Sequence, residues 1–453
     1  MEVDLAIVGA GASGALLAIH LQHRAKNPIS IALIDRFGRF GRGVAYSAPT
    51  LGHLLNVPAI KMSAFSLDER HFVRWMEQNH PPVQLNDFVS RRFYGEYLQA
   101  CLNLNPSDRL AAVRCIVGDV QSLKRKGQNW VLELEGGQTI TAARTVLATG
   151  NLSSTSMPWR SKDPSLEACY RHTPWDQGAF DCLSPEGAVL LLGTGLTWVD
   201  AVLMLSEKGH RGPIWSVSRR GLIPRVHTLP SDPTEPGHPA VYPRSLRALC
   251  REVIRSGRWA EKGTQNWRGS VDALRPYTAE IWRGFSAQER NRFLRHARPY
   301  WDVHRHRMAP QIADVISQRL ASGQLKVLAG RLGNLAEKQG KVRVELRRRG
   351  QPNHPITITV DRILNCTGPA GKLSDVDSPL VKNLLESKEI RPDRLGIGFD
   401  TDAQGRCLDF QGAVRPNIFA LGPLRKGTLW ESVAVPDIRV QAEHLAAQLL
   451  SIE

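Results

Sequence analysis

The sequence lacks several patterns that indicate particular protein classes. None of its seven cysteines forms a C-x-x-C pair, so neither a zinc knuckle nor a redox dithiol is indicated. An odd, unpatterned cysteine count is typical of a reducing compartment. No apolar run approaches the roughly 18 residues that spanning a membrane requires, and an apolar strand begins almost at Met1, where a signal peptide would lie. We therefore expect a cytoplasmic protein with no membrane partner.

Positive charge is abundant, with 59 Lys and Arg against 43 Asp and Glu and a formal net charge of +16. Such a balance is compatible with nucleic acid, an anionic membrane surface or anionic ligands. The basic residues are spread along the chain, and their densest runs, such as residues 347–349, are short. No helix-turn-helix or zinc module is recognisable. We therefore expect phosphate-bearing cofactors and no nucleic acid.

The N-terminal segment VDLAIVGAGASGALLAIHLQ contains a G-x-G-x-x-G motif between an apolar strand and an apolar-periodic helix. Gly9 permits the tight turn, Gly11 lets a pyrophosphate approach the helix N-terminus, and Gly14 lets the helix pack on the strand. The following strand, ISIALID, ends in Asp35, which is placed to accept a hydrogen bond from a ribose hydroxyl. The alternative is a glycine-rich turn without a ligand.

The segment GAVLLLGTGLTWVDAVLMLSEKGHRGPIWSVSRRGLIPR repeats this pattern, with Gly193 and Gly195 after the strand at 188–192. Where the first motif has an aspartate, the second has Ser218 followed by Arg219 and Arg220. A guanidinium pairs with a 2′-phosphate that a carboxylate would repel, so the pattern favours NADPH, with NADH as the alternative.

One position departs from the motif, because Trp198 occupies the place of the third glycine. A side chain of this size is expected to push the helix away from the strand, which puts the pose of the cofactor in question. The alternative for this second motif is a degenerate unit that packs but binds no nucleotide.

A fainter repeat indicates the domain organisation. Residues 115–150 and 326–368 both read as a strand, an alternating β-meander and an apolar strand that ends in T-G. Between residues 231 and 324 a proline-rich loop is followed by helical patterns. We predict an α/β protein with two Rossmann-like dinucleotide-binding domains, β-meanders and a helical insertion. The predicted ranges are 1–182 with 351–453 for a discontinuous FAD domain, and 183–350 for an NAD(P) domain with its insert at about 231–324.

The arrangement resembles the flavoproteins with two dinucleotide-binding domains, in which an A-T-G strand closes the FAD domain and a C-terminal strand–turn–helix lies against the flavin. The segments GRGVAYS…HLLNVPA, GTGLTWVD…SRRGLIPR, PYWDVHRHRMAP and LGPLRKGTLWE look like a bacterial FAD/NAD(P)-binding family. That family is distantly similar to class B flavin monooxygenases, the ornithine and lysine N-hydroxylases.

The resemblance implies FAD and NADPH as cofactors, with O2 and a small nitrogen-containing molecule as substrates. Oxygenation, here an N-hydroxylation, proceeds in that class through a C4a-(hydro)peroxyflavin. Within enzymes, the alternative is an NAD(P)H-dependent flavin oxidase that acts on a small amine or a hydroxylamine. A redox-sensing flavoprotein that binds nucleic acid is a further alternative, and whether the chain forms a homo-oligomer is left open. A thiol–disulfide reductase is disfavoured because no cysteine pair is spaced two or four apart.

The motifs nominate a set of site residues. For FAD they are Gly9, Gly11, Ser13, Gly14, Asp35, Arg36, Gly43, Asn56, Val57, Thr149, Gly150 and Gly422. For NADPH they are Gly193, Thr194, Gly195, Arg219 and Arg220. No catalytic residue stands out, and the candidates are Asn56, His53, Lys61, His304 and Arg305.

The segment ARPYWDVHRHRMAP, residues 297–310, resembles a metal or nucleic-acid motif at first sight. His304 and His306 are two residues apart, however, and in a helix they point to different faces, so we expect no metal. Because the segment closes the helical insert, we expect it to lie over the cofactors, where Arg305 or Arg307 contacts a phosphate or an anionic substrate. The alternative is a polar hinge that packs the insert on the core.

Overall fold

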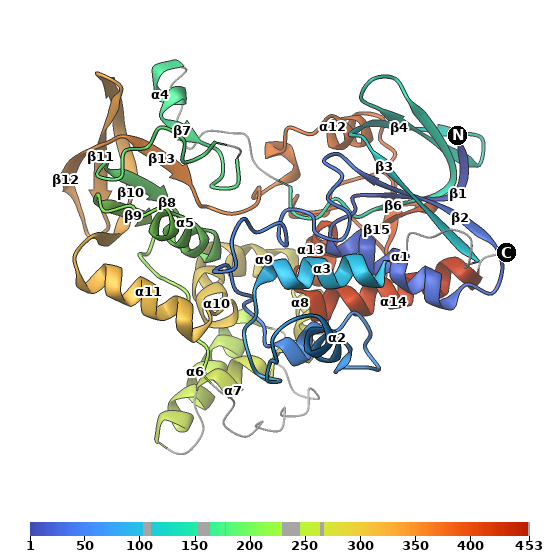
Figure 1. Cartoon of the computed structure of the whole chain (residues 1–453), viewed down its shortest axis with the longest axis horizontal. Helices are drawn as coiled ribbons and strands as arrows, with labels where there is room; N and C mark the ends of the chain where they lie inside the picture. Colours follow the sequence, from blue (N-terminus) through green and yellow to red (C-terminus); the bar gives the residue numbers. More distant parts are fainter. Residues whose placement is uncertain (103–109, 153–163, 177, 229–244, 263–266, 452–453) are drawn as a thin grey trace. The chain divides into compact units, whose positions relative to one another are not determined.

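The computed structural model describes residues 1–102, 110–152, 164–176, 178–228, 245–262 and 267–451 (Figure 1). The chain forms two compact units. Unit 1 comprises Met1–Ser154, Pro276–Ala287 and Ala370–Glu453, and unit 2 comprises Thr155–Arg275 and Gln288–Pro369. These bounds differ from the predicted ranges. Residues 155–182 and 351–369, which were predicted for the FAD domain, belong to unit 2, and residues 276–287 of the predicted insert belong to unit 1.

Unit 1 is built on an eight-stranded sheet with the order β14-β15-β6-β1-β2-β3, to which the β4–β5 hairpin is joined through β6. The strands from β15 to β3 along this order run parallel, whereas β14, β4 and β5 pair antiparallel with their neighbours. The strands are β1 (Glu2–Val8), β2 (Ile29–Asp35), β3 (Ala111–Val117), β4 (Val120–Lys126), β5 (Asn129–Leu134), β6 (Thr139–Leu147), β14 (Arg406–Leu408) and β15 (Val414–Ala420).

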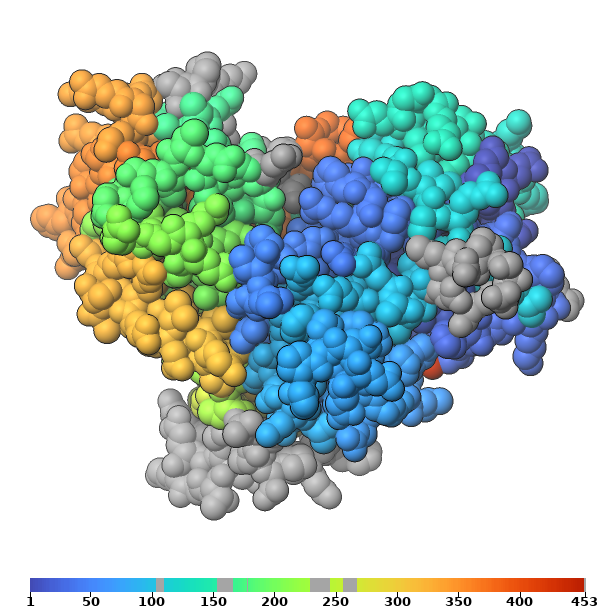
Figure 2. Space-filling view, viewed as in Figure 1, coloured from blue at the N-terminus to red at the C-terminus, as the bar shows by residue number. Residues whose placement is uncertain are grey.

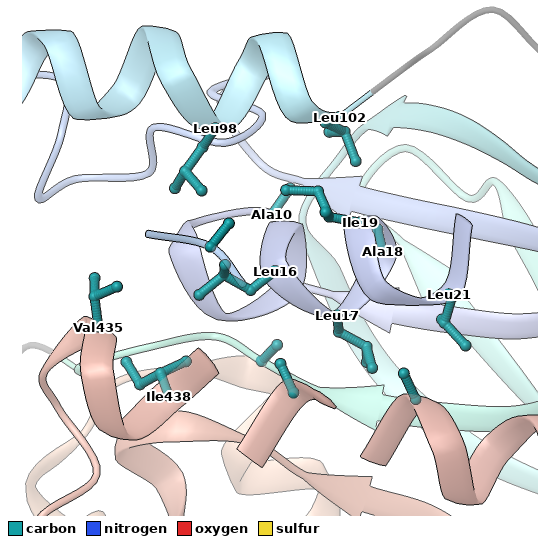
Figure 3. Close-up of a cluster of buried hydrophobic side chains, with 14 of the residues drawn as sticks. Ala10, Leu16, Leu17, Ala18, Ile19, Leu21, Leu98, Leu102, Val435 and Ile438 are labelled. Atoms are coloured by element: carbon teal, nitrogen blue, oxygen red, sulfur yellow. The ribbon is translucent and has the colours of Figure 1, made fainter. Parts of the chain in front are cut away.

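The helices of unit 1 bury the apolar residues of α1 on nearly all sides. In Figure 3, α1 lies between α3, which carries Leu98, and α14, which carries Val435 and Ile438. Figure 2 shows the segment that joins β2 to α3, in lighter blue, at the surface of the unit. The helices are α1 (Ala12–Arg24), η1 (Ala59–Met62), α2 (His71–Asn79), α3 (Arg91–Cys101), α8 (Thr278–Gly284), η6 (Leu373–Asp375), α12 (Pro379–Glu386), η7 (Gly422–Arg425), α13 (Lys426–Leu429) and α14 (Val435–Ser451).

Unit 2 has a seven-stranded sheet with the order β12-β11-β10-β9-β8-β13-β7. The strands from β10 to β7 along this order are parallel, and β10, β11 and β12 form an antiparallel meander. The strands are β7 (Tyr170–Arg171), β8 (Val189–Leu192), β9 (Ile214–Ser218), β10 (Leu325–Lys338), β11 (Lys341–Arg348), β12 (Gln351–Val360) and β13 (Arg362–Asn365).

The described part of the expected insert is mostly helical, and the proline-rich loop at 231–243 lies outside the described residues. One of its helices, α8, belongs to unit 1. The helices of unit 2 are α4 (Pro164–Ala168), α5 (Leu196–Glu207), α6 (Leu246–Lys262), α7 (Trp267–Asp272), the π-helical η5 (Phe293–Ala297), α10 (Arg298–Arg305) and α11 (Pro310–Ala321). Two short helices, η4 (Arg275–Tyr277) and α9 (Ala287–Arg292), cross the sequence boundaries between the units.

The two units repeat one topology. In unit 1 the strand order β3-β2-β1-β6 surrounds the β1-α1-β2 motif, and in unit 2 the order β10-β9-β8-β13 surrounds β8-α5-β9 in the same way. Each unit also carries its own antiparallel meander. This doubly repeated arrangement confirms the predicted α/β class. Within the described part of the chain, no helix combines the length and apolar character that crossing a membrane requires.

Two candidate dinucleotide-binding sites

The first glycine turn connects β1 to α1 and fits closely against the end of β6. Gly9 has a φ of +102°, and a Cβ atom there would lie 2.5 Å from the carbonyl oxygen of Ala148. A Cβ atom at Gly14 would lie 2.0 Å from the carbonyl oxygen of Gly9. Only glycine satisfies both positions, because the backbone itself occupies the space of a side chain.

The N-terminus of α1 has the features of an anion site. Its N-cap, Gly11, provides no side-chain hydrogen bond, and the first turn holds no acidic residue. The loop after β2 lies against it, since Gly41 N donates to Ala10 O at 2.8 Å and a Cβ atom at Gly43 would lie 2.8 Å from Gly11 Cα. Uncapped amides at a helix N-terminus attract phosphate, so these residues fit a pyrophosphate.

Asp35 is the last residue of β2 and shapes the turn that follows it. Its Oδ1 atom accepts hydrogen bonds from the backbone amides of Phe37 and Arg39, each at 3.0 Å. The side chain of Arg36 lies over that of Phe37, with its guanidinium 4.4 Å from the ring centroid. Among the described residues Oδ2 has no hydrogen-bond partner, so it is available to accept from a ribose hydroxyl.

The ends of β6 and β15 lie beside the glycine turn. Leu421 N donates to Leu147 O at 3.0 Å, which pairs the two strand ends. Gly422 follows with a φ of +70°, and a Cβ atom there would lie 2.5 Å from Ser13 Oγ. A Cβ atom at Gly150, next to Thr149, would meet no atom within 4 Å. The structure therefore brings Ser13 and Gly422 together, with open space beside Gly150.

The candidate site residues between β2 and α2 differ in how deeply they are buried. His53 is fully buried, and its Nδ1 atom lies 3.0 Å from Thr50 Oγ1, while its carbonyl oxygen accepts from Arg91 N. His53 is therefore packed inside the protein by contacts on its ring and on its backbone. Asn56 and Val57 are partly exposed on the same loop, and Lys61 is exposed on η1.

The second glycine turn, between β8 and α5, repeats the first in detail. Gly193 has a φ of +95°, and a Cβ atom there would lie 2.6 Å from the carbonyl oxygen of Cys366 at the end of β13. Gly195 caps α5 without a side-chain hydrogen bond, the first turn has no acidic residue, and a Cβ atom at Gly195 would meet nothing within 4 Å. These residues also fit a pyrophosphate.

Trp198 does not displace the helix from the turn, contrary to the expectation from its size. The indole is fully buried, and its Nε1 atom donates to Ser216 Oγ on β9 at 2.8 Å. The helix still begins at Leu196, directly after the glycine turn. The side chain is thus accommodated between helix and sheet, and the N-terminus of α5 keeps its place.

The residues after β9 differ from those after β2. Ser218 ends β9 as Asp35 ends β2, and its hydroxyl is used internally, lying 2.8 Å from Thr194 Oγ1 and accepting from Gly221 N at 3.0 Å. Arg219 is exposed, and Arg220 donates to the hydroxyl of Tyr300 at 3.1 Å. The strand end therefore carries two cations and no carboxylate.

Contacts within the protein hold several polar side chains of the segment 297–310. Arg307 is 4 % exposed, and its two terminal nitrogens donate to the carboxylate of Asp272 at 3.0 and 2.8 Å. His304 Nδ1 lies 2.7 Å from the carbonyl oxygen of Tyr300 within α10. Arg307 is thereby removed from the candidate phosphate ligands, and Arg305, at the end of α10, remains one. The described residues contain no group of three or more His, Cys, Asp or Glu suited to a metal.

All seven cysteines are free thiols. Burial raises the pKa of Cys115 and of Cys101 to about 11, so neither is a thiolate at neutral pH. The structure offers no cysteine pair for thiol–disulfide exchange.

Comparison with known proteins agrees with this geometry. Residues 6–152 match a family described as FAD-NAD(P)-binding. A search of curated proteins found no match.

Solved structures share the fold of the whole chain. The ornithine N-hydroxylase of Kutzneria sp. 744, a structure with reduced FAD, NADP+ and L-ornithine, is 13 % identical with a TM-score of 0.66, covering 99 % of both chains. The L-lysine 6-monooxygenase of Pseudomonas syringae is 16 % identical with a TM-score of 0.66 and the same coverage. The bacillithiol disulfide reductase of Bacillus cereus is 13 % identical with a TM-score of 0.58, covering 100 % of both chains. At these identities the likeness shows the fold, and it confirms the expected resemblance at that level.

Proposed function

We propose that the chain is an FAD- and NADPH-dependent oxidoreductase that oxygenates a small nitrogen-containing molecule. The observation that carries the proposal is the pair of glycine turns, built alike but followed by different strand-end residues. Asp35 suits a ribose with free hydroxyls, whereas Ser218, Arg219 and Arg220 suit a ribose that bears a phosphate. Two sites of different specificity in one chain are what a flavoprotein that takes electrons from NADPH requires.

Unit 1 is the proposed FAD domain. The N-terminus of α1 and the loop around Gly43 hold the pyrophosphate, and Asp35 accepts from the adenosine ribose. Ser13, Thr149, Gly150 and Gly422 line the continuation of the site, with Asn56 and Val57 on the neighbouring loop. The flavin, when bound, supplies electron transfer and reaction with O2, while the protein supplies orientation and the exclusion of water.

Unit 2 is the proposed NADPH domain. The N-terminus of α5, capped by Gly195, holds the pyrophosphate, with Thr194 fixing the turn through its contacts with Ser218 Oγ and Leu222 O at 2.8 and 2.5 Å. The two arginines after β9 bind the 2′-phosphate. NADH lacks this group, so we expect it to bind more weakly.

N-hydroxylation is favoured over thiol–disulfide exchange because no two of the seven cysteines have the close spacing of a redox-active dithiol. It is the activity named for the ornithine N-hydroxylase that shares the fold. An NAD(P)H-dependent oxidase that acts on an amine or a hydroxylamine has the same cofactor requirements and is distinguished by its products. A cytoplasmic location, and small molecules with O2 as the only partners, belong to the same proposal.

The proposal is tested by mixing NADPH-reduced, FAD-loaded protein with O2 in a stopped-flow spectrometer, alone and with a panel of small amines. An oxygenase accumulates a transient absorbing species before the oxidised flavin spectrum returns, and one amine accelerates the decay of that species. Mass spectrometry should then find an added oxygen atom in that amine. Hydrogen peroxide with an unmodified or dehydrogenated amine supports the oxidase instead, and protein that binds no FAD contradicts both.

A further inference from the structure

The helical insert supplies a side chain that holds one of the two arginines after β9. Arg220 and Tyr300 are 80 residues apart in sequence, yet one terminal nitrogen of Arg220 lies 3.1 Å from the Tyr300 hydroxyl. The guanidinium carbon also lies 4.9 Å from the centroid of the tyrosine ring, and the other terminal nitrogen is 3.5 Å from the carbonyl oxygen of His296. The guanidinium is thus fixed by stacking and by hydrogen bonds along one edge.

The neighbouring arginine, Arg219, is not held in this way. Arg219 is exposed and makes no hydrogen bond or ion pair with any residue that the structure describes. A mobile arginine side chain loses rotamer entropy when it binds a ligand, whereas a side chain already held in place has less to lose. The two cations at this strand end therefore differ in how well they are prepared for an anion.

Tyr300 leaves the bound arginine available to a ligand. Tyr300 is 46 % exposed, and the contact lies at the protein surface, where such a ligand can approach. The guanidinium has further N–H groups that the tyrosine does not use.

We propose that Tyr300 is a specificity-determining residue for the 2′-phosphate of NADPH, which acts by positioning Arg220 at the end of β9. The inference rests on the proposed function, because it requires a dinucleotide in unit 2. It assigns a role in cofactor selection to the segment 297–310, in which Arg307 and His304 are held by contacts within the protein.

The test measures binding to full-length, FAD-loaded protein by calorimetry, with NADP+, NAD+ and 2′,5′-ADP as probes. Arg220→Ala should weaken NADP+ and 2′,5′-ADP by about 10- to 100-fold and leave NAD+ unchanged, as expected for loss of charge-assisted hydrogen bonds. Tyr300→Ala should weaken the same two probes by about 5-fold, and Tyr300→Phe, which retains the stacked ring, by about 2-fold. Arg295→Ala is the matched control, because it removes an exposed cation from η5 in the same insert.

The double variant Arg220→Ala with Tyr300→Ala should bind NADP+ no more weakly than Arg220→Ala alone, since Tyr300 acts through the arginine. If wild-type protein binds NADP+ and NAD+ equally, the proposed choice of NADPH is wrong and this inference falls with it. If wild-type protein prefers NADP+ and Arg220→Ala loses the preference, but Tyr300→Ala keeps it, the proposed function stands and the role of Tyr300 alone is overturned. Flavin content and thermal stability close to wild type establish that each variant is folded.

Discussion

The indole nitrogen of Trp198 donates a hydrogen bond to Ser216 Oγ at 2.8 Å, and both side chains are fully buried. The pair fills the space between α5 and β9 where the first motif has Gly14. Nucleotide-binding motifs use glycine there to bring helix and strand together. Here a large buried side chain occupies that position, and its one polar atom is hydrogen-bonded.

Trp198→Phe should therefore lower the stability of the protein without removing the glycine turn. The substitution leaves the Ser216 hydroxyl buried without a partner and opens a small cavity, at a cost of about 2 to 4 kcal/mol in the free energy of unfolding. Urea denaturation followed by far-ultraviolet circular dichroism measures it. In the double variant with Ser216→Ala the loss should be smaller than the sum of the two single losses, and strict additivity argues against the bond.

The two glycine turns allow a matched pair of substitutions. Gly9→Ala places a Cβ atom 2.5 Å from Ala148 O, and Gly193→Ala places one 2.6 Å from Cys366 O, both at positive φ. We expect Gly9→Ala to reduce the FAD content of purified protein. Gly193→Ala should retain FAD and lose NADP+ affinity by at least about 10-fold, because the strained turn no longer presents the amides of α5. Equal loss of FAD in both variants contradicts the assignment of separate sites.

Helix α8 should stabilise unit 1, although it lies in the insert by sequence. Trp282 is 2 % exposed, its Nε1 atom donates to Gly427 O at 2.8 Å, and its ring centroid lies 4.9 Å from that of Trp430. Trp282→Phe removes the hydrogen bond and leaves a buried carbonyl group unpaired, which should cost about 1 to 3 kcal/mol. The loss of stability is measured as a lower melting temperature, and a changed tryptophan emission shows that the environment of the tryptophans has altered. Trp215→Phe, a partly exposed residue of unit 2, is the control.

Stability should fall as the pH drops below the ordinary histidine value. Burial, with the nearby Arg319 guanidinium, lowers the pKa of His210 from its usual 6.5. Below pH 6.5 the unfolded chain takes up this proton and the folded chain does not, so protonation favours unfolding until the pH also falls below the folded-state pKa. His210→Gln should flatten the pH dependence of the melting temperature below 6.5, whereas replacement of the exposed His354 should not. An unchanged slope in His210→Gln contradicts the shift.

Local sequence patterns were sufficient to predict both glycine turns and the strands that flank them. The reason is that a strand, a turn with positive φ and an apolar helix are each specified within about 20 consecutive residues. The repeat of meander and closing strand was visible for the same reason. What the sequence did not show depends on contacts between distant residues.

Three such contacts changed the interpretation of single residues. Arg307 was a candidate ligand until its pairing with Asp272, 35 residues away, was seen. The fully buried position of His53 depends on how a loop folds. The contact between Tyr300 and Arg220 spans 80 residues. No periodicity or spacing encodes these pairings, because each arises from the packing of the insert or loop as a whole.

The central claim, that FAD in this chain takes electrons from NADPH, is tested most directly by adding NADPH to the FAD-loaded protein without oxygen. The account predicts that the visible absorbance of oxidised flavin disappears, faster with NADPH than with NADH, and returns when O2 is admitted. The Arg220→Ala variant should lose the preference for NADPH and keep the reduction. Flavin that stays oxidised with both nucleotides, or is reduced equally fast by them, would contradict the account.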